Sequence, residues 1–377
     1  MKKLTVRVPS VRTWGSVGPT RPAAGAFDRA PFILFWEMTQ ACDLVCRHCR
    51  ACAVPERDPN ELTTAEGKAL LAEARAMGCP VVVLTGGDPA KRPDLVELVR
   101  YGNELGLRMA LTPSATPLVT RALLEELKDA GLARLAVSLD GAAPRAHDLF
   151  RGVDGSWART FEILETAHEL GMTTQVNTTV TRFNAHELER IADQLARLEI
   201  ELWSVFFVVP TGRATEADLL DPDAVEDVLL RLAAIAESAP FDVKTTAAPH
   251  YRRVLLERKH AKDTIKGLSD GIGRAPRGVN DGQGIAFVSR TGDIFPSGFL
   301  PIRCGNVREE GLTTTYREHP FFVALRDPDR LEGKCGACPF KRVCGGSRAR
   351  AYAVYGSPFA EEPACAYVPK GYGEKVA

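Results

Sequence analysis

The sequence predicts an α/β fold: a partial, TIM-like (β/α)6 barrel, open on one side, followed by a smaller C-terminal domain. Six short apolar runs alternate with amphipathic stretches between residues 32 and 208, which is typical of parallel βα units. Six strands are too few to close an eight-stranded barrel. Cysteines gather in residues 42–52 and again in residues 335–365, and the second cluster marks the separate domain. The expected layout is an N-terminal arm (1–31), the barrel (32–213), a helical bridge (214–277) and a C-terminal domain (278–377).

The elements of the barrel follow from apolar periodicity and from signals at their ends. Strands are expected at residues 32–36, 81–85, 108–112, 134–139, 173–180 and 202–208. Helices are expected at residues 64–77, 94–105, 120–130, 157–170 and 185–197. Thr64 is expected to cap the first helix, and four glycines stand where helix C-caps belong: Gly78, Gly106, Gly131 and Gly171.

Outside the barrel the patterns are weaker. Residues 1–31 are rich in Pro, Gly and Arg without periodicity, which favours an extended arm. Residues 214–275 lose the strand rhythm and contain an apolar helix around residues 224–237. From Gly278 onward we expect a hairpin, with strands at 285–289 and 294–295 and its turn at Thr291-Gly292.

Charge and hydropathy exclude several classes of protein. The 377 residues contain 48 Lys and Arg against 48 Asp and Glu, so nothing favours a nucleic-acid or anionic-membrane partner. The longest apolar runs are far shorter than the roughly 20 residues that span a bilayer. Lys2 and Lys3 precede no apolar segment of the kind found in a signal peptide. We therefore expect a cytoplasmic protein that binds neither nucleic acid nor membrane.

The first cysteine cluster follows the first expected strand, with the spacing C-x3-C-x2-C at Cys42, Cys46 and Cys49. In a cytosolic chain, clustered cysteines indicate metal ligands or redox groups more readily than disulfides. Three thiolates can hold three irons of a [4Fe–4S] cube and leave the fourth iron open to a small-molecule ligand. A zinc knuckle is the alternative. Cys52 could supply a fourth thiolate and close the cube, but we interpret it as a bystander or redox thiol.

This arrangement resembles the radical SAM superfamily, whose CxxxCxxC motif occupies the same position after the first strand. Further motifs fall in the family's order. Thr85-Gly86-Gly87-Asp88-Pro89 is similar to the GGEP motif, and the resemblance implies that Gly86, Gly87 and Asp88 hold the amino group of S-adenosylmethionine. Ser138 and Asp140 resemble the ribose-binding segment. By the same resemblance Arg151 pairs with the methionine carboxylate, His48 lies near the adenine, and Asn177 is a further SAM contact.

The second cluster places Cys335, Cys338, Cys344 and Cys365 near the C-terminus. It resembles the auxiliary cluster of SPASM- and twitch-type radical SAM enzymes, which implies a closed [4Fe–4S] centre for electron transfer. A four-thiolate zinc site is the alternative that spacing alone leaves open. Ser297 and Arg348 stand where the full SPASM pattern has cluster ligands, so one auxiliary cluster is expected rather than two.

The resemblance implies an enzyme, an oxidoreductase that cleaves SAM reductively to a 5′-deoxyadenosyl radical and abstracts hydrogen from its substrate. A flavodoxin- or ferredoxin-type electron donor is implied as well. The second cluster is similar to that of radical SAM proteins of heme d1 synthesis and of the alternative heme pathway, which act on tetrapyrrole propionates. Substrate contacts are then expected from Arg213, His250, Tyr251, Arg252 and Arg253. The second reading is maturation of a ribosomally made peptide by decarboxylation or crosslinking. A non-catalytic iron–sulfur carrier or a zinc scaffold would have no use for the SAM motifs.

Overall fold

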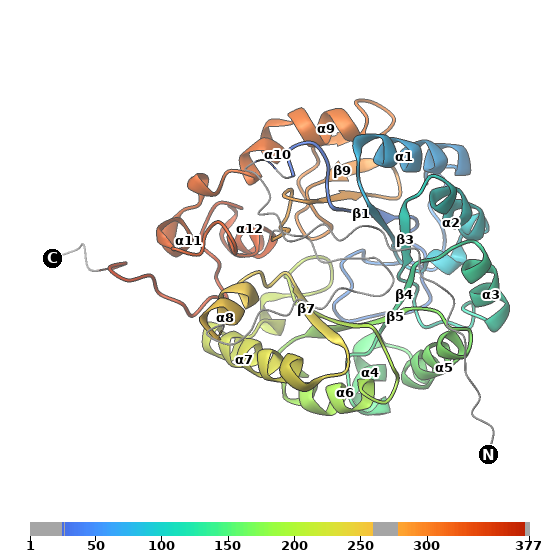
Figure 1. Cartoon of the computed structure of the whole chain (residues 1–377), viewed down its shortest axis with the longest axis horizontal. Coiled ribbons are helices and arrows are strands. Elements are labelled where there is room, and N and C mark those ends of the chain that lie inside the picture. Colours follow the sequence, from blue (N-terminus) through green and yellow to red (C-terminus); the bar gives the residue numbers. More distant parts are fainter. Residues whose placement is uncertain (1–24, 26, 259–277, 374–377) are drawn as a thin grey trace, which may run out of the picture.

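The computed structural model describes residues 25, 27–258 and 278–373. Its centre is one ten-stranded sheet in the order β10-β9-β8-β1-β2-β3-β4-β5-β6-β7, curved into an open barrel with most helices outside it (Figure 1). The strands are β1 (Ile33–Glu37), β2 (Val81–Thr85), β3 (Arg108–Leu111), β4 (Arg134–Ser138), β5 (Thr174–Val180), β6 (Leu202–Phe207), β7 (Asp242–Thr246), β8 (Ile285–Val288), β9 (Asp293–Phe295) and β10 (Gly305–Asn306). The first six are the predicted barrel strands, so the expected partial α/β barrel is confirmed.

Two strands extend the parallel sheet beyond the predicted six. Strand β7 pairs with β6, with Trp203 opposite Val243, and lies in the segment expected to be a helical bridge. Its sequence, Asp-Val-Lys-Thr-Thr, buries only Val243, so it carries no apolar run that would reveal it. Strand β8 pairs in parallel with β1 and turns back antiparallel into β9. The predicted hairpin is therefore present, but its first strand is also part of the barrel sheet.

The helices predicted within residues 64–197 and around residues 224–237 are present with small shifts at their ends, and further helices that were not predicted accompany them. The observed helices are α1 (Thr64–Met77), α2 (Leu95–Glu104), α3 (Arg121–Asp129), α4 (Pro144–Arg151), α5 (Ser156–Glu169), α6 (Leu188–Leu195), α7 (Pro222–Ser238), α8 (Tyr251–Arg258), α9 (Leu312–Glu318), α10 (Pro320–Leu325), α11 (Gly333–Ala337) and α12 (Arg348–Tyr355). The N-cap of α1 is Thr63 rather than the predicted Thr64. Thr63 accepts from the Glu66 amide while the Glu66 carboxylate accepts from the Thr63 amide, a reciprocal capping box.

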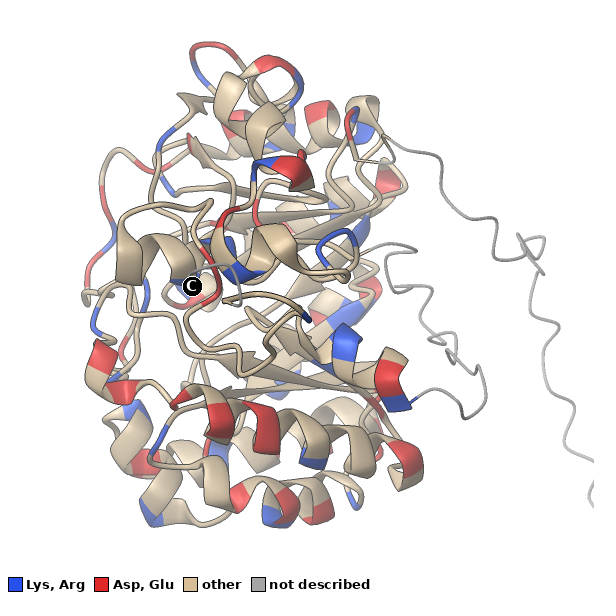
Figure 2. Cartoon of the chain, turned by 90° about the vertical axis from the view of Figure 1, so that its left-hand side faces the viewer, with Lys and Arg blue, Asp and Glu red and all other residues tan. Residues whose placement is uncertain are grey.

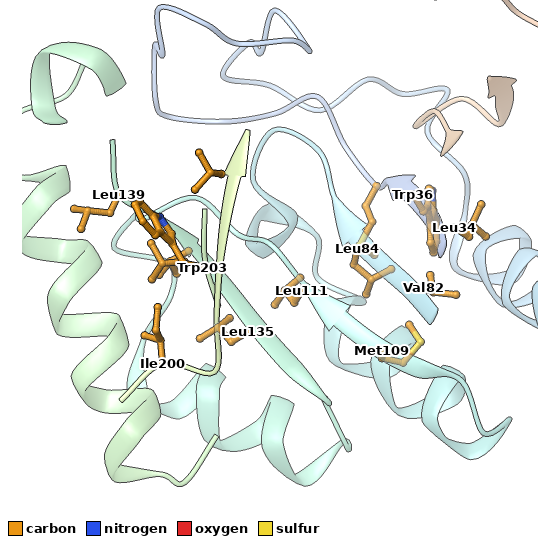
Figure 3. Close-up of a cluster of buried hydrophobic side chains, with 14 of the residues drawn as sticks. Leu34, Trp36, Val82, Leu84, Met109, Leu111, Leu135, Leu139, Ile200 and Trp203 are labelled. Carbon is orange, nitrogen blue, oxygen red and sulfur yellow. The ribbon is translucent and has the colours of Figure 1, made fainter. Parts of the chain in front are cut away.

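The main core lies between the outer face of the sheet and the surrounding helices. Leu34 and Trp36 of β1, Leu84 of β2 and Trp203 of β6 have no exposed area and point toward this layer (Figure 3). In α1, a Cβ on Gly67 would lie 2.4 Å from the Trp36 ring, so glycine allows the helix to approach the sheet closely. Residues that alternate with these along β1, such as Glu37, face the barrel interior.

The segment after β10 forms a helical cap at the open side of the barrel. Helices α11 and α12 lie beside the edge where α8 follows β7 (Figure 1). Acidic and basic residues are interspersed over the helices (Figure 2), as the balanced composition requires. Among the residues that the structure describes, no helix is both long and apolar enough to cross a bilayer. The predicted N-terminal arm and the end of the predicted bridge lie mostly outside the described residues.

Candidate active site

A pocket opens at the carboxyl ends of β2, β3 and β4. Its walls come from the loops after these strands and from the cysteine loop that follows β1. The lining residues are Leu44, Thr85, Gly86, Gly87, Thr112, Pro113, Ser114, Ala115, Ser138, Arg151 and Ser156. Four of the predicted SAM residues are therefore brought together: Gly86, Gly87, Ser138 and Arg151.

Gly86 and Gly87 allow the loop after β2 to pack directly against the cysteine loop. The amide of Gly87 donates to the Thr39 carbonyl at 2.8 Å, and the next amide donates to the Ala41 carbonyl at 2.7 Å. A Cβ at either glycine would lie 2.3 Å from a carbonyl oxygen, that of Thr39 for Gly86 and that of Ala41 for Gly87. Gly86 also has φ of +150°. No larger residue fits at these positions without separating the two loops.

The thiols of the cysteine loop lie beside this pocket. Cys42 Sγ is 3.2 Å from the Ser114 hydroxyl, and Arg151 Nη1 is 3.8 Å from Cys46 Sγ. Ser114 was not predicted, although it follows the third strand as Gly87 follows the second. Cys52 is exposed and has a φ of +48°, and it does not line the pocket.

Arg213 supports the cysteine loop by hydrogen bonds to its backbone. Its guanidinium donates to the Cys46 carbonyl at 3.1 Å and to the Ala53 carbonyl at 2.8 Å, and its amide donates to the Cys49 carbonyl at 3.0 Å. A Cβ on the preceding Gly212 would lie 2.3 Å from that Cys49 carbonyl. Arg213 therefore holds the cysteine loop in place, and its expected role as a substrate contact stays a prediction.

Arg151 is placed by a buried ion pair with Asp140. Asp140 also accepts from the Thr179 amide at 2.6 Å and does not line the pocket. Its carboxylate thus pairs with Arg151, and its expected contact with the ribose stays a prediction. The Nε atom of Arg151 is buried and has no hydrogen-bond partner, which leaves a cationic donor available to an anion. His147, whose pKa burial lowers to about 3, accepts from the Asp140 amide and is neutral.

Asp88 is fully buried and saturated with donors. Its carboxylate accepts from the amides of Ala90 and Ser114 at 3.1 and 3.2 Å, and from the Thr116 hydroxyl at 2.7 Å. It therefore ties the loop after β2 to the loop after β3. The carboxylate does not line the pocket, whose lining at this loop comes from Thr85, Gly86 and Gly87, and its expected contact with an amino group stays a prediction.

His48 and Asn177 lie at the edges of the site. The His48 ring stacks on Phe150 with centroids 4.3 Å apart, and burial lowers its pKa well below the usual range. Asn177 pairs in register with Ser138 across β4 and β5 and accepts from Gln175 at 2.7 Å. Neither residue lines the pocket, so their expected SAM contacts stay predictions.

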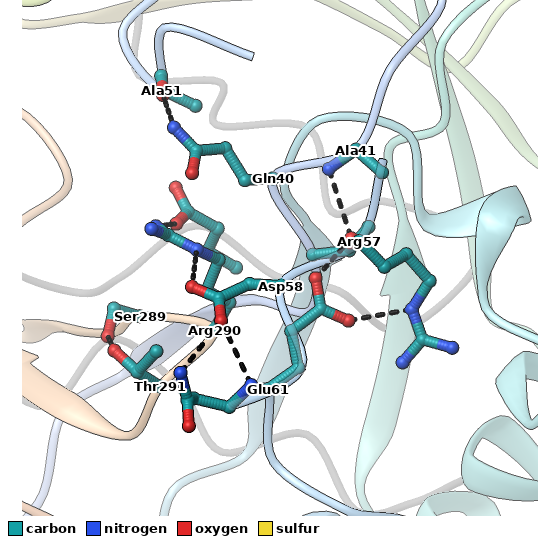
Figure 4. A network of polar contacts seen from close by, with 12 residues as sticks. Gln40, Ala41, Ala51, Arg57, Asp58, Glu61, Ser289, Arg290 and Thr291 are labelled. Atoms are coloured by element: carbon teal, nitrogen blue, oxygen red, sulfur yellow. Dashed lines mark hydrogen bonds and ion pairs between the residues drawn. The ribbon is translucent and has the colours of Figure 1, made fainter. Parts of the chain in front are cut away.

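Polar contacts fix the segment between the cysteine loop and α1. Glu61 accepts from the Thr39 hydroxyl at 2.5 Å and from Arg57 at 2.7 Å, and Gln40 donates to the Ala51 carbonyl at 2.7 Å (Figure 4). Because Thr39 and Gln40 connect β1 to the cysteines, this network orders the N-terminal end of the cysteine loop.

A second candidate site brings together all four C-terminal cysteines. Cys335, Cys338, Cys344 and Cys365 line one cavity, together with Arg253, Lys334, Phe340, Lys341, Gly345, Gly346, Glu362, Tyr367 and His250. His250 is 1% exposed, and burial lowers its pKa to about 4. Within the described chain, no three His, Cys, Asp or Glu side chains are close enough to hold a single metal ion. The four thiols thus surround a space instead of meeting at one point.

The other predicted substrate residues also lie at this second site or near it. Arg253 is 4% exposed and pairs with Glu226 and Glu257, while its guanidinium covers the Tyr367 ring. Tyr251 is buried, and Arg252 donates to the Val343 carbonyl at 3.3 Å. None of the predicted substrate residues lines the pocket beside the first cysteine cluster.

A buried ion pair connects the second site to the barrel. Arg350 pairs with Glu362 at 2.9 Å and donates to the carbonyls of Phe207, Val208 and Ala247 at the ends of β6 and β7. Both side chains are 1% exposed. No sequence pattern predicts this pair, because its members belong to a short helix and a loop.

Cys79 and Cys304 stand apart from both clusters. Each is buried, and burial raises the pKa of each thiol to about 12. Ser297 and Arg348 are also buried. Arg348 donates to the carbonyls of Pro358 and Ala360 and lies 3.8 Å from Cys335 Sγ.

Comparison with known proteins identifies the class. Residues 36–195 match the family model of the radical SAM superfamily. The similarity to individual relatives extends over about nine tenths of the chain. The chain belongs to the radical SAM superfamily: it is an enzyme that uses a SAM-binding [4Fe–4S] cluster and S-adenosylmethionine.

Among its relatives, the AdoMet-dependent heme synthase of Methanosarcina barkeri is 39% identical over 91% of this chain and 99% of its own. The PqqA peptide cyclase of Rhodopseudomonas palustris is 30% identical over 90% of this chain and 88% of its own. In structure the chain is similar to SuiB of Streptococcus suis bound to S-adenosylmethionine, with a TM-score of 0.70 at 17% identity, covering 90% of this chain and 78% of SuiB.

Proposed function

We propose that this enzyme acts on the propionate side chains of an iron porphyrin, as its relative named AdoMet-dependent heme synthase suggests. The observation that carries this proposal is the 39% identity that extends over nearly the whole of both chains. The peptide cyclase is a more distant relative at 30% identity, so peptide maturation is the second candidate.

We propose Cys42, Cys46 and Cys49 as ligands of the SAM-binding cluster. When bound, the cluster and SAM supply a one-electron reductive cleavage and the hydrogen-abstracting 5′-deoxyadenosyl radical. The pocket beside Cys42 and Cys46 supports this assignment, because its carbonyl and hydroxyl groups suit an amino group and a ribose. The unpartnered Nε of Arg151 suits the methionine carboxylate.

On the substrate, the proposed reaction removes one hydrogen atom, one CO₂ and one electron from each propionate. The C–H bond and the bond to the carboxylate break, and a carbon–carbon double bond forms. We propose that an auxiliary [4Fe–4S] cluster on Cys335, Cys338, Cys344 and Cys365 serves electron transfer. The four thiols line one cavity, which supports a shared metal centre, and a four-thiolate zinc site is the alternative.

Two arginines at the mouth of the barrel suit a substrate carboxylate better than Arg213 does. Arg50 and Arg290 both contact Glu37, at 2.5 and 3.3 Å, where β1 and β8 end side by side. Their side chains remain 20% and 26% exposed, and Arg50 lies over the Phe287 ring. We propose that they receive a propionate that competes with Glu37.

The donor of the first electron is proposed to be of flavodoxin or ferredoxin type. Val45, between two of the cluster cysteines, is 62% exposed, so the cysteine loop reaches the surface where a donor protein could dock. All ten cysteines are free of disulfides, which supports a cytoplasmic location.

The test is anaerobic turnover of the reconstituted enzyme with SAM, a reductant and an iron porphyrin that carries propionates. We expect 5′-deoxyadenosine and, by mass spectrometry, loss of a hydrogen atom and CO₂ from the porphyrin. The Cys42→Ala/Cys46→Ala/Cys49→Ala variant should form neither product. If precursor peptides stimulate 5′-deoxyadenosine formation and porphyrins do not, the peptide reading replaces this one.

A further inference from the structure

The buried imidazole of His250 lines the second cysteine cavity and has no hydrogen-bond partner among the described residues. The residue lies between β7 and α8, is 1% exposed, and lines the cavity with the four cysteines. Among the residues that the structure describes, neither Nδ1 nor Nε2 has a hydrogen-bond partner. Leaving a buried polar group unsatisfied costs free energy, so we expect the imidazole to have a partner that occupies the cavity.

The charged groups around His250 are already engaged with one another. Glu362 accepts from Arg350 and from the amides of Ser347 and Ala364, and Arg253 is held by two glutamates. On the barrel side, the imidazole lies in an edge-on arrangement with the Phe207 ring, with centroids 6.3 Å apart. The space among the four thiols is the remaining direction for an N–H group.

The chain already directs other N–H groups at these sulfur atoms. Cys335 Sγ accepts from the Glu362 amide at 3.3 Å and is approached by Arg348, and Cys344 Sγ accepts from the Gly346 amide at 3.4 Å. An imidazole carries at least one N–H in every common protonation state. The N–H group of His250 can therefore donate to a sulfur atom in this cavity in addition to the backbone amides.

We propose that His250 donates a hydrogen bond to a thiolate or sulfide of the auxiliary cluster and raises its reduction potential. Hydrogen bonds to sulfur stabilise the more negative, reduced state of an iron–sulfur cluster and are one of the determinants of its potential. His250 is thus a positioning residue that tunes the acceptor, and this inference rests on the auxiliary cluster proposed above.

The test measures the potential of this cluster alone. In the full chain carrying Cys42→Ala/Cys46→Ala/Cys49→Ala, only the second site can hold iron. An EPR-monitored redox titration then compares this parent with His250→Phe, which keeps a ring without a donor, and with His250→Gln, which keeps an N–H. His186, whose side chain is 73% exposed, provides the matched control His186→Phe.

We expect His250→Phe to lower the equilibrium constant for reduction about tenfold, which is about 59 mV for a one-electron couple. His250→Gln should recover part of the shift, and His186→Phe should show none. His250→Leu replaces the Phe variant if the latter binds no iron. Full iron with an unchanged potential would overturn the inference while leaving the cluster in place. Loss of one iron from both apolar variants would make His250 a ligand, which also overturns it. No iron–sulfur signal in the parent would instead refute the auxiliary cluster.

Discussion

Arg213 shows how one side chain can order a loop whose thiols bind a cluster. Its guanidinium holds the carbonyls of Cys46 and Ala53, and each hydrogen bond to a charged group contributes about 1.5–3 kcal/mol. We expect Arg213→Met to weaken iron retention by the first cluster at least about tenfold in chelator competition. The Arg182→Met variant, at an exposed arginine, should retain iron like the parent. Equal retention in both variants would contradict the role of Arg213.

The pair of Arg350 and Glu362 predicts a pH-dependent stability. Burial alone would raise the pKa of Glu362, but Arg350, His250 and the backbone amide of Ala364 outweigh it, so the pKa is lowered. Because the pKa of Glu362 is lower in the folded protein, its ionised carboxylate stabilises the fold at pH values above its unfolded pKa of about 4.3. This stabilisation is lost as the pH falls through the folded pKa. Removing one member of a buried pair costs about 3–5 kcal/mol.

We therefore expect Glu362→Gln to reduce the free energy of unfolding by about 3 kcal/mol at pH 7, with urea as denaturant. The difference from the parent should shrink steadily below about pH 4.5. A difference that stays constant from pH 7 to pH 3 would show that the Glu362 charge is not the cause.

At the scale of elements, the loop after β2 depends on contact between two backbones. A Cβ at Gly87 would meet the Ala41 carbonyl at 2.3 Å, and relieving such overpacking costs about 1–3 kcal/mol. We expect Gly87→Ala to weaken SAM binding by about tenfold or more, measured by calorimetry on reconstituted protein. Gly171→Ala, which meets nothing within 4 Å but has φ of +67°, should lose some stability and keep its SAM affinity. If both variants bind SAM equally well, the close approach of the Gly87 backbone to the Ala41 carbonyl is not required for SAM binding.

Elements were predictable where burial leaves a periodic pattern. Strands β1 to β6 are apolar because helices cover their outer face, and the sequence shows them clearly. Strand β7 lies at the edge of the sheet and buries one side chain, so its residues need not be apolar. The choice of Thr63 over Thr64 as N-cap depends on reciprocal hydrogen bonds with Glu66, and two adjacent threonines look alike until the backbone is known.

At the scale of the whole molecule, the two cysteine sites can be separated by substitution. We expect the Cys335→Ala/Cys338→Ala/Cys344→Ala/Cys365→Ala variant to keep cleaving SAM, because the first pocket shares no lining residue with the second cavity. Porphyrin decarboxylation should be lost, and iron content should fall by about the amount of one cluster. The comparison is 5′-deoxyadenosine against porphyrin product by chromatography. A variant that retains full porphyrin turnover would exclude a role for the second site.

The sequence predicted those parts of the two sites whose residues lie close together in the chain, but not the contacts between distant residues. Motifs close in sequence predicted the cysteine loop and the glycines after the second strand, and the structure places Gly86 and Gly87 in the lining of the first pocket. The roles expected for these residues stay predictions. The roles expected for Arg213, Asp88 and Asp140 depend on which distant backbone groups each side chain meets, and spacing carries no such information. For the same reason the sequence could not show that His250 and Arg253 lie beside the C-terminal cysteines.

The parallel pairing of β8 with β1 also has a consequence for synthesis of the chain. Strand β1 begins at Ile33, and its partner β8 begins at Ile285, so one edge of β1 waits for a segment made roughly 250 residues later. At about 5–20 residues per second, that interval is on the order of tens of seconds. Until then, the strand that leads into the cluster loop exposes unpaired backbone groups, which are a template for aggregation. A chain ending after β7 should therefore be recovered mainly in inclusion bodies, and iron should enter the first site only after the C-terminal segment has joined the sheet.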